Sequence, residues 1–281
     1  MIELPVDEAA VVVDYDTTEA LEIYQMIKTG ALVLLILVSF TFQSRLSGAE
    51  VSPPIRIAAA SSLRFVMDEI IDAYAAQSGR VAPQVVYGSS GNLFRQISQG
   101  APFDLFVSAD AALTEKLENA LPETGTAVEF GVGRLVLFTR KPVAVGLSEF
   151  KALLEHTDEF KLAIANPRHA PFGRAAQQAL RSLDYWDAAT PRLVYAEKVS
   201  QAAQFVASGA AEFAVISRSL AVSPALRNTG SFKLIPAKHH QPVVQSIIVL
   251  TREKPVQELF SFILKSQSAV EILQEYGLRD E

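Results

Sequence analysis

The 281-residue chain contains no cysteine, a single tryptophan and three methionines. The lack of cysteine excludes disulfide bonds, thiolate metal sites and a lipid-anchored cysteine at the mature N-terminus. Positive charge is also scarce, because 25 lysines and arginines stand against 31 aspartates and glutamates. A chain without a basic field is not expected to bind nucleic acid. With 49% hydrophobic and 20% charged residues, the composition predicts a globular protein with a large core, divided into two lobes.

The net charge of −6 is concentrated in one segment. Residues 1–25 hold seven acidic residues and no basic one, so the rest of the chain carries about +1. An acidic segment does not fit a targeting signal. We therefore interpret residues 1–25 as an N-terminal extension that is not native, and we expect translation to begin at Met26.

Residues 26–49 have the organisation of a secretory signal peptide. Lys28 supplies a positive n-region, Ala31–Phe42 a twelve-residue apolar run, and Ser47-Gly48-Ala49 a small-x-small cleavage pattern. The alternative is a transmembrane anchor, for which the apolar run is short. We expect cleavage after Ala49 and a mature, periplasmic protein that begins near Glu50.

Signals of catalysis or of a bound metal are weak. The four histidines have no metal-ligand spacing with carboxylates, and we expect them to be structural or exposed; they are His156, His169, His239 and His240. Asp110 has no partner acid or histidine nearby in sequence, so we interpret it as a helix N-cap. The chain also lacks G-x-S-x-G, Walker and H-E-x-x-H motifs. We therefore expect neither an enzyme nor a resident cofactor.

The stretch from Val85 to Asp110 carries the strongest functional pattern. A short apolar strand turns through Gly88-Ser89-Ser90-Gly91 into a helix, which is followed by an apolar strand at Asp104–Ser108. The first amides of a helix have no partner within it, and together with the helix dipole they attract anions. Because residues 88–94 contain no lysine or arginine, neutral donors would hold the anion. The alternative is that Ser89 or Ser90 merely caps its helix.

The same strand-serine-helix pattern occurs earlier in the chain. The strand that begins at Ile55 runs into Ser61-Ser62 and then into an amphipathic helix. In an open α/β sheet, such turns meet at the carboxyl ends of the strands, where ligands bind. Two units of this kind therefore predict one shared site.

A second lobe is expected from further strands that also end in turns. These are Lys161–Ala165 before the turn 166–173, Arg192–Ala196 before Val199-Ser200, and Glu212–Ser217. We expect the chain to leave the first lobe near Arg140-Lys141-Pro142 and to return around Pro236–Pro242. The first lobe would comprise residues 54–138 and 240–281, and the second lobe residues 139–239.

Three sequence segments then connect the chain to a known family. In order, they are AAASSL, GSSGNLFRQISQGAPFDLFVSAD and ANPRHAPFG. From about residue 54 to 281 the chain resembles the periplasmic molybdate-binding proteins of molybdate ABC transporters. The resemblance implies a type II periplasmic binding protein fold: two α/β lobes with mixed, mostly parallel sheets, helices on both faces and a hinge of two crossing strands. It also implies a ligand in the cleft and closure about the hinge.

The resemblance also implies five ligand-binding positions. Matching the family's motifs to this sequence gives Ser62, Ser90, Phe172, Val199 and Ser217. Phe172 and Val199 can offer only backbone amides and packing. The family has a tyrosine near Ser217 and this sequence has none at that point, so the fifth donor departs from the family pattern.

The resulting hypothesis is a monomeric receptor that delivers molybdate or tungstate to an inner-membrane ABC permease. A receptor for sulfate or another tetrahedral oxyanion is the alternative within the binding class. A periplasmic serine hydrolase that uses Ser62 or Ser90 is the rival from another class. Its weakness is the missing general base, since no histidine lies in either serine turn, although the fold could supply one.

Overall fold

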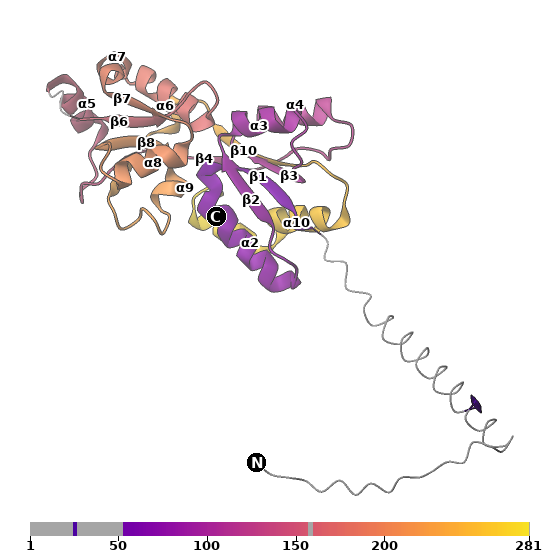
Figure 1. The fold of residues 1–281 in the computed structure, drawn as a ribbon. Helices are drawn as coiled ribbons and strands as arrows, with labels where there is room; N and C mark the ends of the chain where they lie inside the picture. Colours follow the sequence, from indigo (N-terminus) through magenta and orange to yellow (C-terminus); the bar gives the residue numbers. More distant parts are fainter. Residues whose placement is uncertain (1–24, 27–52, 157–159, 281) are drawn as a thin grey trace, which may run out of the picture. The chain divides into compact units, whose positions relative to one another are not determined.

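Two five-stranded sheets form the framework of residues 54–281 in the computed structural model, which describes residues 25–26, 53–156 and 160–280 (Figure 1). The predictions about the extension, the signal peptide and its cleavage site lie outside the described residues, apart from Gln25 and Met26. Within the described ranges, no helix is both long and apolar enough to cross a membrane.

Sheet A belongs to the first lobe. Its strands, in spatial order, are β2 (Gln84–Gly88), β1 (Arg56–Ala60), β3 (Leu105–Ser108), β10 (Val243–Val249) and β4 (Val128–Gly133). β1 pairs in parallel with both β2 and β3, whereas β10 runs antiparallel to β3 and β4. Four of the five strands therefore run in one direction.

Helices cover both faces of sheet A, because apolar residues point alternately to its two sides. Ile57 and Ala59 face the layer of α2 (Arg64–Ser78), α10 (Lys254–Lys265) and α11 (Gln267–Glu275). Ala58 and Phe106 face the opposite layer, where Leu93 of α3 (Ser90–Ser98) and a leucine of α4 (Ala111–Ala120) pack against them. Figure 1 shows α3 and α4 on one side of the sheet and α2 and α10 on the other.

Sheet B belongs to the second lobe and repeats this plan. Its strands, in spatial order, are β7 (Leu193–Ala196), β6 (Leu162–Ala165), β8 (Phe213–Ser217), β5 (Leu135–Thr139) and β9 (Ser231–Leu234). β6 pairs in parallel with β7 and β8, and β5 runs antiparallel to β8 and β9. This sheet is therefore also mixed and mostly parallel.

The helices of the second lobe pack on both faces of sheet B. The connection from β6 to β7 runs through α6 (Pro171–Ser182), and that from β7 to β8 through α8 (Val199–Ala207). Because the two crossovers move in opposite directions along the sheet, the right-handed rule places these helices on opposite faces. The remaining elements are α5 (Leu147–His156), α7 (Trp186–Ala189), α9 (Arg218–Ala221) and the 3-10 turns η2 (Thr190–Arg192) and η3 (Ala237–His239).

The chain passes between the sheets at two places. β4 ends at Gly133 in sheet A and β5 begins at Leu135 in sheet B, so Arg134 alone separates them. The assignment of residues 135–138 to the first lobe is therefore wrong, since β5 pairs with β8 and β9. The break at Arg140-Lys141-Pro142 ends β5 within the second lobe. The chain returns to sheet A between Leu234 of β9 and Val243 of β10.

Candidate functional site

Segments that follow strands of both sheets surround a small cavity of about 10 Å³ between the lobes. From the first lobe come the turns that follow β1 and β2, and from the second lobe come the segments that begin α6 and α8. Four of the five predicted residues line this cavity, namely Ser62, Ser90, Phe172 and Val199. The sequence patterns thus converge in space, with two positions from each lobe.

The hydroxyl of Ser62 is buried without a partner. It belongs to η1 (Ser61–Leu63), the 3-10 turn between β1 and α2, and the residue is 2% exposed. Its Oγ has no hydrogen-bond partner among the described residues. A buried polar atom that stays unpaired costs about 1–3 kcal/mol, so its placement calls for an explanation. A ligand in the cavity would supply the missing partner.

Ser90 is held so that its hydroxyl hydrogen remains available. Its Oγ accepts a hydrogen bond of 3.0 Å from the backbone N–H of Ala109, which begins the turn after β3. Because a hydroxyl both donates and accepts, this contact occupies a lone pair and leaves the hydrogen free. Ser90 is fully buried and lines the cavity.

Three helices begin at the cavity without a side-chain cap among the described residues. They are α3, α6 and α8, whose N-cap residues are Ser89, Ala170 and Lys198. The first amide groups of a helix lack partners within the helix, and the dipole adds partial positive charge there. The residues that line the cavity include no charged side chain. The arrangement therefore offers neutral donors to an anion.

Ser217, the fifth predicted residue, is not among the residues that line this cavity. Its Oγ caps α9 by accepting from the N–H of Leu220 at 3.3 Å, and it lies 3.0 Å from Ser219 Oγ. The Ser219 hydroxyl donates to the carbonyl oxygen of Ser62 at 2.7 Å. The Ser217 hydroxyl therefore caps α9, and its neighbour Ser219 makes the contact with Ser62 from the second lobe.

Two further serines line the cavity, and both belong to serine pairs that are visible in the sequence. Ser61 and Ser89 line the cavity next to Ser62 and Ser90. Ser61 Oγ lies 3.5 Å from the backbone nitrogen of Ser200 in α8. Ser89 Oγ lies 2.9 Å from Nδ1 of His169. The signal in the sequence was a pair of serines after each of the two strands. Because only one serine of each pair was predicted to bind the ligand, Ser61 and Ser89 were left out.

The two lobes touch across the cavity through several polar contacts. The N–H of Gly91 donates to the carbonyl of His169 at 3.0 Å, and Lys198 Nζ donates to the carbonyl of Tyr87 at 3.1 Å. Burial, together with the hydrogen bond that its hydroxyl donates to Asp68, raises the pKa of Tyr87. Asn92 Nδ2 donates to Glu197. Because these hydrogen bonds join the two lobes, the cleft between them is closed in this structure.

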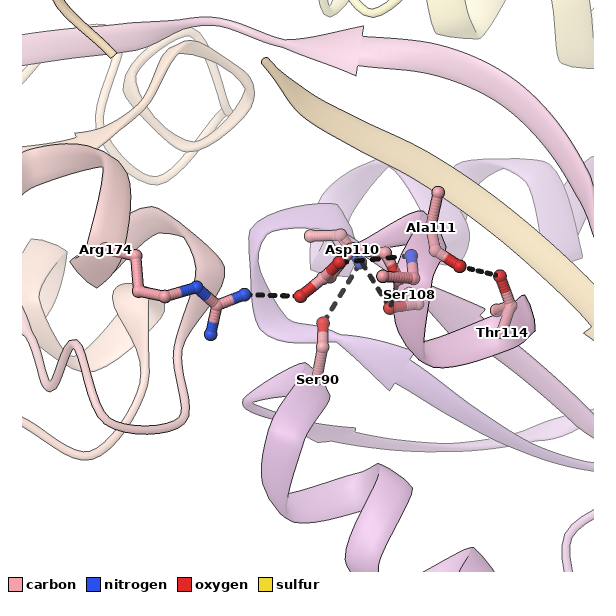
Figure 2. A network of polar contacts seen from close by, with 8 residues as sticks. Ser90, Ser108, Asp110, Ala111, Thr114 and Arg174 are labelled. Carbon is pink, nitrogen blue, oxygen red and sulfur yellow. Dashed lines mark hydrogen bonds and ion pairs between the residues drawn. The ribbon is translucent and has the colours of Figure 1, made fainter. Parts of the chain in front are cut away.

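Asp110 and Arg174 form an ion pair beside the cavity, as Figure 2 shows. Asp110 also accepts from the N–H of Ala112 at 3.2 Å, which confirms its prediction as the N-cap of α4. Arg174 reaches this carboxylate from α6. Ala109, next to Asp110, and Pro171, three residues before Arg174, both line the cavity. The pair therefore connects the two lobes next to the candidate donors.

Metal coordination finds no support in the parts of the chain that the structure describes. Across these ranges, no group of three or more histidine, cysteine, aspartate or glutamate side chains could hold a metal ion. The donors at the cavity are hydroxyls and amides, which suit the oxygens of an anion.

Comparisons with known proteins cover both lobes. A family model described as bacterial extracellular solute-binding protein matches residues 55–279. Molybdate-binding protein ModA of Azotobacter vinelandii is 32% identical over 229 residues, which cover 79% of this chain and 88% of that protein. ModA of Rhodobacter capsulatus is 32% identical over 194 residues, which cover 68% and 75%. The solved Azotobacter vinelandii periplasmic molybdate-binding protein matches with a TM-score of 0.72 at 32% identity, covering 81% of this chain and 99% of that one.

Proposed function

The chain belongs to the family of bacterial extracellular solute-binding proteins, and we propose that it captures molybdate or tungstate in the cavity between its lobes. Two relatives at 32% identity carry the name molybdate-binding protein. The observation that carries the proposal is the buried, unpartnered hydroxyl of Ser62 in a cavity surrounded by uncapped helix starts. A bound oxyanion would give that hydroxyl its missing acceptor.

The proposed ligand set has two hydroxyls and two backbone amides. Ser62 and Ser90 donate through their side chains from the first lobe, and Phe172 and Val199 donate through their N–H groups from the second lobe. Phe172 and Val199 stand in the first turns of α6 and α8, where amides lack helical partners. Ser217 is excluded from this set because its hydroxyl caps α9.

Neutral donors also explain a preference among anions. A fully deprotonated tetrahedral dianion has acceptors alone, which match a cavity of hydroxyl and amide donors. Phosphate near neutral pH carries a proton and needs an acceptor for it, and the lining includes no carboxylate side chain. Discrimination against phosphate therefore follows from an unsatisfied proton, whereas discrimination against the smaller sulfate depends on size.

As part of the same proposal, the mature protein is a periplasmic monomer that delivers its ligand to an inner-membrane ABC permease. The name of the solved relative, which includes the word periplasmic, and the secretory pattern at residues 26–49 support the compartment. Binding uses no resident cofactor and no catalytic step. The two chain crossings, at Arg134 and between Leu234 and Val243, are the expected hinge.

Isothermal titration with molybdate, tungstate, sulfate and phosphate tests this function. We expect molybdate and tungstate to bind, sulfate to bind more weakly, and phosphate to give no detectable heat at the same concentration. Molybdate should also raise the melting temperature, because a ligand that binds the native state stabilises it. Sulfate binding as tight as molybdate binding would contradict the named ligand, and no binding by any of the four would contradict oxyanion capture.

One contact gives a hydrolase specific support as the second candidate. Ser89 Oγ lies 2.9 Å from His169 Nδ1, and His169 Nε2 lies 3.5 Å from Glu197 Oε2, which resembles a serine-histidine-acid line. However, Ser89 is only 5% exposed and the cavity offers little room for an ester with its leaving group. The test is hydrolysis of p-nitrophenyl acetate by the parent protein and by Ser89→Ala. Equal hydrolysis rates for the parent and Ser89→Ala would contradict the hydrolase hypothesis, and loss of hydrolysis in Ser89→Ala would support it.

A further inference from the structure

Ser89 is the N-cap residue of α3, but its side chain does not cap the helix. Its hydroxyl instead points across the cleft, where Oγ lies 2.9 Å from Nδ1 of His169 in the second lobe. Ser89 also lines the cavity next to Ser90. The hydroxyl therefore stands between an imidazole nitrogen on one side and the proposed oxyanion on the other.

His169 is held from several directions in the closed cleft. Its carbonyl oxygen accepts from the N–H of Gly91 at 3.0 Å, and its own N–H donates to the carbonyl of Asn166 at 3.3 Å. A Cβ at position 91 would stand 2.6 Å from the His169 carbonyl oxygen, so this close approach requires glycine. The ring is almost buried, and its Nε2 lies 3.5 Å from a carboxylate oxygen of Glu197. The ring orientation is thus fixed by both lobes.

The contact between Ser89 and His169 decides what Ser89 can offer to an anion. A serine hydroxyl has one hydrogen and two lone pairs. If Nδ1 accepts that hydrogen, a lone pair of Ser89 faces the cavity and repels an anion. If Nδ1 instead carries a hydrogen and donates it, the Ser89 hydrogen is free to turn toward the anion. A ring that carries its hydrogen on Nδ1 therefore makes Ser89 a donor toward the cavity.

We propose that His169 is a positioning residue, which donates from Nδ1 to Ser89 in the closed cleft and so makes the Ser89 hydroxyl an additional donor to the bound oxyanion. This inference rests on the proposed oxyanion function. The Ser89 hydroxyl would replace the fifth donor that was expected at Ser217, because the Ser217 hydroxyl caps α9. Since Ser89 and His169 belong to different lobes, the donor is complete only after closure.

A double-mutant cycle on molybdate affinity tests the inference. The variants are Ser89→Ala, His169→Ala and their combination, measured by isothermal titration. Each single variant should weaken molybdate binding about tenfold, as for a lost hydrogen bond to a charged group. The combination should bind no more weakly than the weaker single variant, because His169 acts through Ser89. Additive losses would show that the two side chains act independently and would overturn the proposal.

Two further variants separate the Nδ1 contact from packing. His169→Asn keeps a hydrogen-bond group near the position of Nδ1 and should bind molybdate within about threefold of the parent. His156→Asn makes the same change at an exposed histidine of the second lobe and should match the parent. If His169→Asn is as weak as His169→Ala, the loss comes from ring packing and the proposal is wrong.

The parent protein distinguishes this inference from the proposed function. A parent that binds none of the four oxyanions overturns both. A parent that binds molybdate, together with a His169→Ala variant that binds it equally well or more tightly, overturns the positioning role alone. Ligand-free melting temperatures of the variants show that each one folds, and Ser89→Ala provides an independent measurement should His169→Ala prove unstable.

Discussion

Ser62 and Ser90 both follow strands of sheet A, yet their hydroxyls have different surroundings. Ser62 Oγ is unpartnered among the described residues, whereas Ser90 Oγ accepts from the N–H of Ala109. Replacing either one by alanine should raise the dissociation constant for molybdate about tenfold to a hundredfold, from roughly 1.5–3 kcal/mol for a hydrogen bond to a charged group. Their effects on ligand-free stability should differ.

Ser62→Ala removes a buried polar atom that has no partner, so the ligand-free protein should melt at the parent temperature or above it. Ser90→Ala leaves the Ala109 N–H without its acceptor and should lower stability by about 1 kcal/mol. Titration calorimetry and thermal melts, with and without molybdate, measure both quantities. Unchanged molybdate affinity in both variants would mean that other groups form the site.

The same residues show how far sequence reasoning reaches at this scale. The serines that follow β1 and β2 line one shared cavity because the carboxyl ends of parallel strands lie at the same edge of a sheet. Ser217 ends strand β8, but its hydroxyl accepts from the N–H of Leu220 and caps α9. Whether such a hydroxyl caps its helix or faces the cavity depends on one side-chain rotamer. The sequence contains no signal for that choice.

Among the elements, α6 and α4 meet through the ion pair of Arg174 and Asp110 (Figure 2). The pair connects the lobes, so Arg174→Gln should favour the open cleft and speed the release of molybdate. Both side chains are partly exposed, which limits the expected loss of affinity to roughly threefold to fivefold. The effect should shrink at high salt because screening already weakens the pair.

Stopped-flow release of molybdate at two salt concentrations measures this effect. Lys151→Gln is a matched control, because Lys151 also pairs with a carboxylate in the second lobe but within α5 alone. We expect Lys151→Gln to release molybdate at the parent rate. Equal release rates for Arg174→Gln and the parent would show that the pair forms without contributing to closure.

Elements with strong apolar patterns were predictable, and weakly patterned ones were not. The strands β1, β3, β6 and β8 are buried at nearly every position and stood out in the sequence. β4 was missed because its sequence VEFGVG contains two glycines and is half exposed. β9 was missed because it is a short strand at the edge of sheet B. Without β4, the lobe boundary was placed beyond β5 instead of at Arg134.

For the whole molecule, the family match begins at residue 55, just after the predicted targeting segment. We predict that protein recovered from the periplasm begins at Glu50, because Ser47-Gly48-Ala49 provides the small residues that signal peptidase requires. Intact-mass spectrometry of the periplasmic fraction checks this. Ala49→Arg should leave the precursor uncleaved. Recovery of residues 1–25 in the mature protein would contradict both the cleavage site and the start at Met26.

The position of β10 has a consequence for how the chain is made. Residues 243–249 lie in the interior of sheet A, between β3 and β4, although they are synthesised after every strand of sheet B. A growing chain therefore completes all strands of the second lobe while the first lobe still lacks an interior strand. Until β10 leaves the ribosome, β4 has no neighbour in its sheet. The lobe that begins first along the chain is therefore the one whose sheet is completed last.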